Sequence, residues 1–430
     1  MKYLIHYAFI FNLFTVGVAQ AVEISLSEAL KEAEANSPKL KSAAYQSKAA
    51  DQRVREARSG YLPSVDLAFI GSDGSPGSFS FLGVDNNISA ADRIGEGGAA
   101  TLRQTIWDFG RTSSSVKLAN SEKDFQQTSA ALSLAEVDLQ ILNLYLTCSF
   151  LKTATADAQF TAHQAQVIAS ETRNYVRSGQ RSVIEKYLVD AQAKEAETLV
   201  AELSTRITNV ETRLTLMIGR DKNEKAQCPD LSNQETEILV LEKNTKNSPM
   251  LEVFRASANM ARFQLEQAKA DENPTFFGLV TGGYFNDIQK KDGWNYSAGI
   301  ALTFPLFDGF HRDAQVERKK AELESSKALI NYSQQLVDES NSKYDEQMSS
   351  LKVRLNYLGA EVKLAKEAFG LAKGRFLGFK GSMIDLRESL RNLNRVVLSV
   401  DEARRDLLIA RGASAIYNGA RSNHYEDPSH

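Results

Sequence analysis

Residues that interrupt a helix are scarce in this chain of 430 residues, which contains only 8 prolines and 25 glycines. Proline lacks a backbone N–H and glycine lowers helix stability, so their scarcity favours long, uninterrupted helices. No proline or glycine lies between residues 111 and 177, and no proline lies between 311 and 377. At 1.5 Å per residue, a helix of roughly seventy residues extends on the order of 100 Å.

The residues that usually build catalytic or metal sites are also few and scattered. The 5 histidines form no H-E-x-x-H pattern, the 2 cysteines lie far apart, and no serine occupies a G-x-S-x-G turn. We therefore expect neither an enzyme nor a metal site nor a cofactor. A net charge of −3 and a pI of about 6.1 give no reason to expect nucleic acid as a partner.

The N-terminal segment MKYLIHYAFIFNLFTVGVAQA combines Lys2, an apolar stretch and an A-x-A sequence at residues 19–21. This pattern predicts a secretory signal peptide; the alternative, a membrane anchor, lacks a stop-transfer pattern after it. No cysteine begins the predicted mature chain at Val22, which argues against a lipoprotein anchor. After residue 21 no run approaches the roughly 18 apolar residues of a membrane-spanning helix.

A duplicated unit organises the rest of the chain. Asn36-Ser37-Pro38 recurs as Asn247-Ser248-Pro249, and Ser182-Val183-Ile184-Glu185 is answered by Ser382-Met383-Ile384-Asp385. The predicted division is a signal peptide at 1–21, a first repeat at 22–225 with a β-hairpin at about 61–107, an inter-repeat linker at 226–240, a second repeat at 241–418 with a β-hairpin at about 274–307, and a disordered tail at 419–430.

Four segments alternate between apolar and polar residues, which predicts β-strands. Val65, Leu67 and Phe69 form the apolar face of the first, and Phe277 and Leu279 are the apolar positions of the third. We expect each successive pair to form a hairpin, the first with a long, exposed, mobile loop. The four segments are 64–69, about 99–107, about 275–285 and 294–306.

The remaining segments carry apolar residues at alternating intervals of three and four, the spacing of a coiled-coil seam. A repeated junction joins each strand pair to the long helix that follows. Pro305 offers no N–H for strand pairing, glycine permits a sharp turn, and aspartate is placed to cap the helix. The junction residues are Asp108 and Gly110 in the first unit and Pro305, Asp308 and Gly309 in the second.

Four strands with one apolar face cannot close a barrel by themselves. A closed membrane barrel requires strands from several chains, and three copies provide twelve, all antiparallel. Strands of about nine to eleven residues suit a tilted bilayer span. Trp107, Trp294, Tyr296 and Phe307 near the strand ends are typical of an interfacial aromatic belt. The alternative is an ordinary soluble sheet, but no other segment is suited to cover its apolar face.

The chain resembles the TolC-like outer membrane efflux proteins over about 24–418. The resemblance rests on the duplicated N-S-P-x-L sequences, on Leu62-Pro63 before the first strand, on P-L-F-D-G at 305–309 and on its weaker copy at 106–111. It implies a mixed α and β, mainly α fold: a trimeric 12-stranded outer-membrane β-barrel continuing into a long periplasmic α-helical coiled-coil barrel. The implied partners are two further copies, outer membrane lipid, a periplasmic adaptor and an inner-membrane ABC or RND-type transporter.

The resemblance also implies a constriction at the periplasmic tip, built by acidic side chains and held by neighbouring contacts. By motif position the acidic candidates are Asp385, Glu388 and Glu185, and the candidates for latching contacts are Arg181, Lys380 and Arg387. Carboxylates gathered on a threefold axis attract cations and repel anions. Phe379 stands where the motif expects glycine, and a register error of one residue would leave these side chains as ordinary surface charges.

Cys148 occupies a seam position halfway along its predicted helix, and Cys228 lies in the inter-repeat linker. In the family this linker contributes to a belt around the middle of the tunnel, so a disulfide between the two cysteines is compatible with the geometry. Otherwise Cys148 is a small buried apolar residue.

Two hypotheses for function follow. The first is a passive exit duct of a tripartite efflux or type I secretion system. The second is a secreted or periplasmic coiled-coil adaptor or adhesin without a pore, whose hairpins are soluble.

Overall fold

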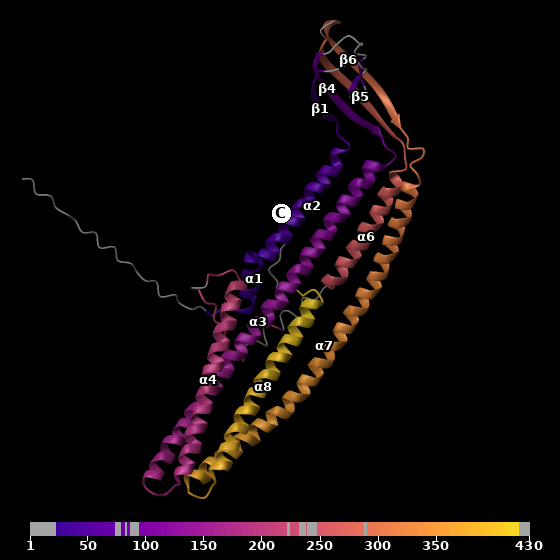
Figure 1. The fold of residues 1–430 in the computed structure, drawn as a ribbon. Coiled ribbons are helices and arrows are strands. Elements are labelled where there is room, and N and C mark those ends of the chain that lie inside the picture. The colour runs from indigo at the N-terminus through magenta and orange to yellow at the C-terminus, as the bar shows by residue number, and fades with distance from the viewer. Residues whose placement is uncertain are drawn as a thin grey trace, which may run out of the picture.

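A small sheet stands at one end of a long bundle of helices in the computed structural model (Figure 1). The structure describes residues 23–73, 79–81, 84–86, 94–221, 224–231, 238, 247–287 and 290–420. The predicted signal peptide and residues 421–430 of the predicted tail lie outside this part. The elements are α1 Leu26–Asn36, α2 Pro38–Ser59, β1 Ser64–Asp73, β2 Phe79–Phe81, β3 Val84–Asn86, β4 Ile94–Trp107, α3 Arg111–Arg177, α4 Val183–Met217, α6 Pro249–Ala270, β5 Thr275–Asp287, β6 Lys290–Thr303, α7 His311–Leu377 and α8 Met383–Tyr417.

The two halves of the chain follow the same order of elements. A helix leads into a strand pair, which leads into a helix of 67 residues and then one of 35 residues, in α3 and α4 and again in α7 and α8. The bounds of both long helices agree with the segments predicted from the scarcity of proline and glycine. The exact limits assigned to the repeats and the linker remain a prediction.

The duplicated N-S-P sequence has a structural reason in each half. Ser37 and Ser248 are the N-caps of α2 and α6, and the proline follows at the start of the helix, where no N–H is needed. The Asn36 side chain donates to the carbonyl of Ile218 at the end of α4. In the first half the motif therefore fastens the start of α2 to the end of α4.

Helix α3 forms the centre of the bundle. It packs against α1, α2, α4, α6 and α8. One 18-residue window of α3 is apolar enough by composition to cross a membrane, but 56% of that window is buried inside the protein. Contacts with five helices account for this apolar character, so we interpret α3 as a core helix.

Apolar residues with the spacing predicted for a coiled-coil seam face the interior. Val137, Ile141 and Cys148 of α3 are buried, as are Leu351 and Leu358 of α7. Burial on α3 extends beyond the seam to Leu142, Tyr145 and Leu146, because α3 has more neighbours than a two-helix coiled coil provides.

The four long strands form one antiparallel sheet in the order β1-β4-β5-β6. Within the described residues, β1 and β6 each pair on one side only. The strands contain 10, 14, 13 and 14 residues, so three of them exceed the predicted length. The expected first loop contains a second, small hairpin of β2 and β3. The second loop is shorter than predicted because pairing continues to Asp287 and Lys290, and β6 ends at Thr303, before Pro305.

The strand register corrects one prediction about the faces of the sheet. Leu102 lies opposite Val65 and Val280, and Val280 lies opposite Ala298, so these residues share one face. Phe277 and Leu279 lie opposite Thr105 and Arg103, on the other face. Phe276 and Phe277 are consecutive apolar residues, so alternation in β5 did not identify the face.

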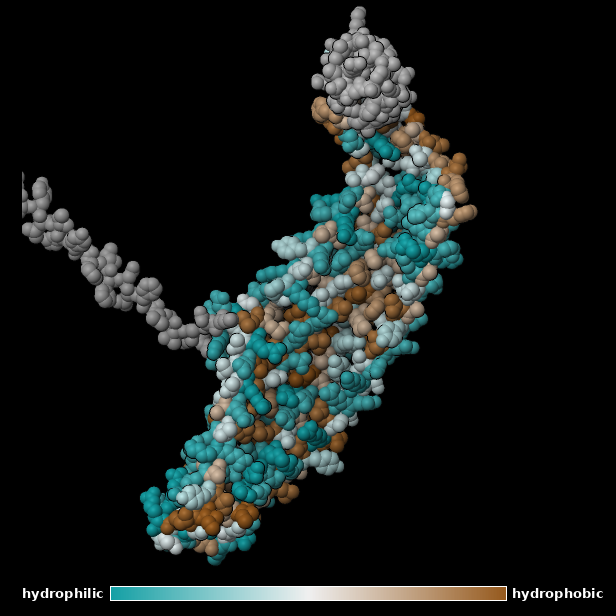
Figure 2. Space-filling model, in the orientation of Figure 1, coloured by the Kyte–Doolittle hydropathy of each residue, from teal (hydrophilic) through white to brown (hydrophobic). Residues whose placement is uncertain are grey.

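The apolar face of the sheet is exposed. Its exposed large side chains are Val65, Leu67, Phe69, Leu102, Val280, Tyr284, Trp294, Tyr296, Ile300 and Leu302. Hydrophobic side chains also gather around the base of the sheet, where it joins the helices (Figure 2). Each fully exposed large apolar residue forgoes about 1.5–3 kcal/mol of burial energy in water. Such a face requires an apolar environment.

The end of α8 differs from the prediction of a tail beginning at residue 419. Gly419 has a φ of +80°, and its N–H bonds the carbonyl of Ile416. Ala420 is buried, and its N–H bonds the carbonyl of Ala415. These two residues close the C-terminus of α8 as a left-handed cap.

Candidate functional site at the hairpin tips

Two turns that connect successive helices lie side by side at the end of the bundle farthest from the sheet (Figure 1). Residues 178–182 connect α3 to α4, and residues 378–382 connect α7 to α8. Ser182 and Ser382 cap the second helix of each pair by accepting a hydrogen bond from the N–H of Ile184 and of Ile384. The two turns therefore have the same register.

Phe379 occupies the left-handed position that glycine fills in the first turn. Gly179 has a φ of +73° and Phe379 a φ of +60°. A non-glycine residue in this region costs on the order of 1 kcal/mol. The Tyr175 ring, whose centroid lies 4.8 Å from that of Phe379, contacts it edge to face. The departure from the glycine motif thus changes the residue and leaves the register intact.

Arg181 joins the two helical hairpins, the first formed by α3 and α4 and the second by α7 and α8. Its guanidinium donates to the carbonyls of Phe376 and Gly381 at the end of α7 and in the second turn. It also lies 4.2 Å from the ring centroid of Phe376 and 5.3 Å from that of Phe379. The side chain is only 10% exposed. A planar fork between two rings and two carbonyls is a specific arrangement that lysine cannot reproduce.

Glu185 serves the first hairpin locally. One carboxylate oxygen accepts from Arg181 at 2.9 Å, and the other accepts from the backbone N–H of Ser182 at 3.1 Å. It completes a capping box and orients Arg181. Its carboxylate is therefore engaged within its own turn.

The acidic pair of the second hairpin is more open. Asp385 is exposed in the first turn of α8, where the positive end of the helix dipole favours a carboxylate. Within the described residues its side chain makes no hydrogen bond or ion pair. Glu388 accepts from Arg387 at 3.2 Å, and Arg391 lies 3.9 Å away. Lys380 is exposed, and its carbonyl is 3.5 Å from Arg375.

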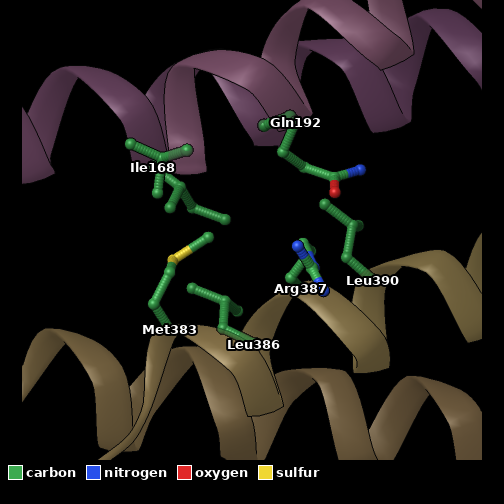
Figure 3. Close-up of a pocket in the computed structure, with 8 residues that line it drawn as sticks. Ile168, Gln192, Met383, Leu386, Arg387 and Leu390 are labelled. Atoms are coloured by element: carbon green, nitrogen blue, oxygen red, sulfur yellow. The ribbon is translucent and has the colours of Figure 1, made fainter. Parts of the chain in front are cut away.

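Behind the tips, the two hairpins share an apolar cluster. Figure 3 shows Met383, Leu386 and Leu390 of α8 facing Ile168 of α3 and Gln192 of α4 around a cavity of about 10 Å³. A cavity of this size holds at most one water. Arg387 and Gln192 each have one buried side-chain atom, Nε and Oε1, without a hydrogen bond in the described part of the chain.

Ion pairs and hydrogen bonds continue the connection up the helices. Arg391 of α8 pairs with Glu195 of α4 at 3.3 Å, and Lys373 of α7 donates to Gln164 of α3 at 2.9 Å. Sequence reasoning identified Arg181 as a latching candidate, but it missed these contacts and the two aromatic rings. In the sequence, Phe379 stands out only as a departure from glycine.

The strand–helix junctions differ in detail from the prediction. The Asp108 carboxylate accepts from the N–H groups of Gly110 and Thr112, and Asp308 accepts from that of His311. The capping residues themselves are Gly110 and Phe310, two positions later.

Each junction contains two consecutive left-handed residues, and in each only one of them is glycine. The φ values are +52° and +94° at Phe109 and Gly110, and +71° and +65° at Gly309 and Phe310. The order of phenylalanine and glycine is therefore reversed between the copies while the backbone path is kept. The exposed phenylalanine at each junction lies at the base of the sheet.

Cys148 of α3 and Cys228 form a disulfide, with Cα atoms 5.9 Å apart. Both residues are buried. The Leu231 N–H donates to the Thr153 hydroxyl at 3.1 Å, and the N–H of Ile24 donates to the carbonyl of Gln227 at 2.9 Å. The described part of the inter-repeat segment is thus fastened to the middle of α3.

Comparisons with known proteins agree with this arrangement. The sequence profile described as "Outer membrane efflux protein" matches residues 29–220 and 240–416. Protein CyaE of Bordetella pertussis is 24% identical over 318 residues, which is 70% of this chain and 64% of that protein. The chain thus spans slightly less than two thirds of that relative's length.

Two solved structures share the fold. The outer membrane protein VceC of Vibrio cholerae superposes with a TM-score of 0.77 at 16% identity, covering 92% of this chain and 96% of VceC. The CmeC outer membrane channel of Campylobacter jejuni gives 0.76 at 14% identity, covering 94% of this chain and 87% of CmeC.

Proposed function

The chain belongs to the outer membrane efflux protein family, and on that premise we propose that it is the exit duct of a tripartite efflux or type I secretion system. The protein lies in the outer membrane and extends into the periplasm, as its family does. In this role it conducts substrates passively from an inner-membrane ABC or RND-type transporter and a periplasmic adaptor to the exterior. A duct of this kind performs no covalent chemistry.

The exposed apolar face of the four-stranded sheet carries this proposal. β1 and β6 have unpaired sides within the described residues, and the exposed large apolar side chains of the four strands lie on one face of the sheet. Lipid satisfies the apolar face, but open edges in a bilayer cost several kcal/mol per unpaired group. When three copies join their edges, the twelve antiparallel strands close into a barrel. No edge is then left unpaired, and the apolar face lies against lipid.

Helix α7 supports the same assembly below the membrane. Val353, Tyr357, Leu364 and Leu371 are more than half exposed, and the last three are spaced seven residues apart. A heptad stripe of exposed apolar residues is typical of a helix that packs against another. In the trimer, this stripe packs against the neighbouring copy and closes the helical tunnel.

The tips form the controlled end of the duct in this proposal. Asp385 and Glu388 supply six carboxylates in a trimer, which attract cations when they are gathered near the axis. Arg181 holds the second hairpin against the first, so breaking its contacts with Phe376 and Gly381 is part of opening.

The adaptor contacts the exposed apolar residues of the two tips in this proposal. Val183, Ile184, Tyr187 and Ile384 are each more than half exposed. Figure 2 shows a hydrophobic patch at this end of the molecule. Exposed apolar groups surrounded by charged side chains are typical of a protein interface.

Membrane fractionation and planar-bilayer recordings test the proposal together. We expect the full-length protein in the outer membrane fraction, detergent extraction as trimers, and stepwise ion conductance after reconstitution. A monomer released with the soluble periplasmic proteins, or inserted protein that gives no conductance, would contradict the exit-duct function.

A further inference from the structure

Helices α3 and α8 pack against each other along their length. This contact, the α3–α8 seam, connects the first helical hairpin of the chain to the second. Near its upper end, Gly412 approaches Leu142 so closely that an added Cβ would lie 2.7 Å from the leucine side chain. Farther down, the Arg405 guanidinium lies 4.6 Å from the ring centroid of Phe150. The Thr161 hydroxyl donates to Oδ1 of Asn394 at 3.4 Å. Any movement of the second hairpin away from the first must separate this seam.

A pair of carboxyl groups lies within the seam, between these contacts. Asp401 of α8 is 6% exposed, and its carboxyl faces that of Asp157 across the packed helices α3 and α8. Its second oxygen, Oδ2, has no partner in the described part of the chain. Two ionised carboxylates repel each other at hydrogen-bond distance, so one of them must carry a proton for the pair to stay together.

The surroundings of Asp401 favour its protonated form. The pKa of Asp401 is raised to about 7, mainly because its carboxyl is buried, and the charge of Asp157 and the hydrogen bond to it contribute in the same direction. Arg404, on the next turn of α8, acts in the opposite direction. Arg405 is paired with Asp406. The ion pairs of α8 with α4 and α7, Arg391–Glu195 and Arg395–Glu361, lie on earlier turns of α8.

We propose that Asp157 and Asp401 share one proton that locks α3 against α8, so that losing this proton loosens the seam between the two hairpins. At acidic pH the Asp401 hydroxyl donates to the Asp157 carboxylate and the hairpins stay together. At alkaline pH the two negative charges push them apart. The lock itself depends only on packing within one chain, and its use in opening the duct rests on the proposed function.

The direction of the pH effect follows from linkage. Asp401 has a higher pKa in the closed seam than the ordinary value of 3.8 that it regains when the seam opens to water. Stabilisation of the seam is therefore complete below the ordinary pKa and is lost as the pH rises through about 7. The equilibrium constant for opening should rise about a hundredfold between pH 5 and pH 8 and then level off.

Hydrogen exchange of the purified full-length protein measures this constant. Peptides covering 150–165 and 394–408 report on the two sides of the seam, after correction for the intrinsic pH dependence of exchange. In the wild type we expect protection to fall about a hundredfold from pH 5 to pH 8. Asp401→Asn should hold protection nearly constant over this range, and Asp157→Asn should move the transition to lower pH by removing the opposing charge.

Glu402→Gln is the matched control, because Glu402 neighbours Asp401 but is exposed. It should retain the wild-type profile. A flat wild-type profile, or a wild-type profile in Asp401→Asn, would overturn the proposal. If Asp401→Asn does not fold, an unshifted transition in Asp157→Asn would overturn it too. If protection rises with added Mg²⁺ or Ca²⁺ at constant pH, a cation and not a proton holds the two carboxylates together, and the proposal is overturned. Conductance is not measured here, so failure of the lock leaves the channel proposal standing.

Discussion

Replacement of Arg181 by alanine should favour the open tip. The substitution removes the two hydrogen bonds that cross from the first hairpin to the second, and also the contacts with the rings of Phe376 and Phe379. A hydrogen bond from a charged group contributes about 1.5–3 kcal/mol, but the two carbonyls can regain water once the tip opens.

The net loss is therefore about 2 kcal/mol for each chain, which corresponds to an increase of roughly thirtyfold in the equilibrium constant for opening. Single-channel recording in planar bilayers provides the assay. We expect Arg181→Ala to spend a much larger fraction of time in its highest conductance state than the wild type does.

Two further variants separate the loss of the contacts from the loss of a positive charge. Arg177→Ala removes an exposed arginine at the end of α3, four residues before Arg181. It should leave the open fraction unchanged. Arg181→Lys keeps the charge without the planar fork and should fall between the wild type and Arg181→Ala. Equal effects of Arg177→Ala and Arg181→Ala, or no effect of either, would refute the latch.

Three other outcomes are expected. Replacing Cys148 and Cys228 together by serine opens a loop of 80 residues, and it should cost up to about 4 kcal/mol of stability, measured as a lower denaturant midpoint; an unchanged midpoint in the oxidised wild type and the variant would contradict this. Ile300→Arg places a charge on the apolar face of β6 and should cost about 2–4 kcal/mol near the bilayer midplane, which reduces the amount of protein assembled in the outer membrane. Ser297→Arg, on the opposite face of the same strand, should assemble normally. Equal losses for the two variants would argue against a lipid-facing side. Asp401→Asn should abolish the pH dependence of protection in the α3–α8 seam, and Glu402→Gln should not.

The long helices could be predicted because one physical rule governs them over many residues. Both long segments lack proline, the first also lacks glycine, and the heptad spacing of Val137, Ile141 and Cys148 indicates a helix with an apolar seam. The duplicated serine motifs at 182 and 382 likewise fixed the register of the turns, which Phe379 preserves in a left-handed conformation.

The strand ends and one sheet face could not be predicted from side chains alone. Asp287 and Lys290 are polar, and they join the ladder through backbone hydrogen bonds. In β5, Phe276, Phe277, Leu279 and Val280 place apolar residues on both faces, so the register with β4 decides which face is which.

The contacts of the candidate site could not be predicted from the sequence, because they join backbone groups and residues that only the fold brings together. Arg181 donates to the backbone carbonyls of residues 376 and 381, and a carbonyl has no signature in the sequence. Asp157 and Asp401 meet only because α3 and α8 run side by side. The residue types at the tip could be predicted, but their partners required the fold.

Crosslinking between copies tests most directly whether the two free sheet edges pair to close a barrel. A chain with Leu67→Cys on β1 and, in turn, Ala298→Cys, Ile300→Cys or Leu302→Cys on the same face of β6 can be oxidised in isolated outer membranes; the native cysteines are already paired. We predict a denaturing gel with covalent dimers and trimers for at least one pair, no larger species, and at most a dimer for Leu67→Cys alone. The absence of crosslinks for every pair, or a ladder that continues beyond three chains, would contradict the trimeric barrel.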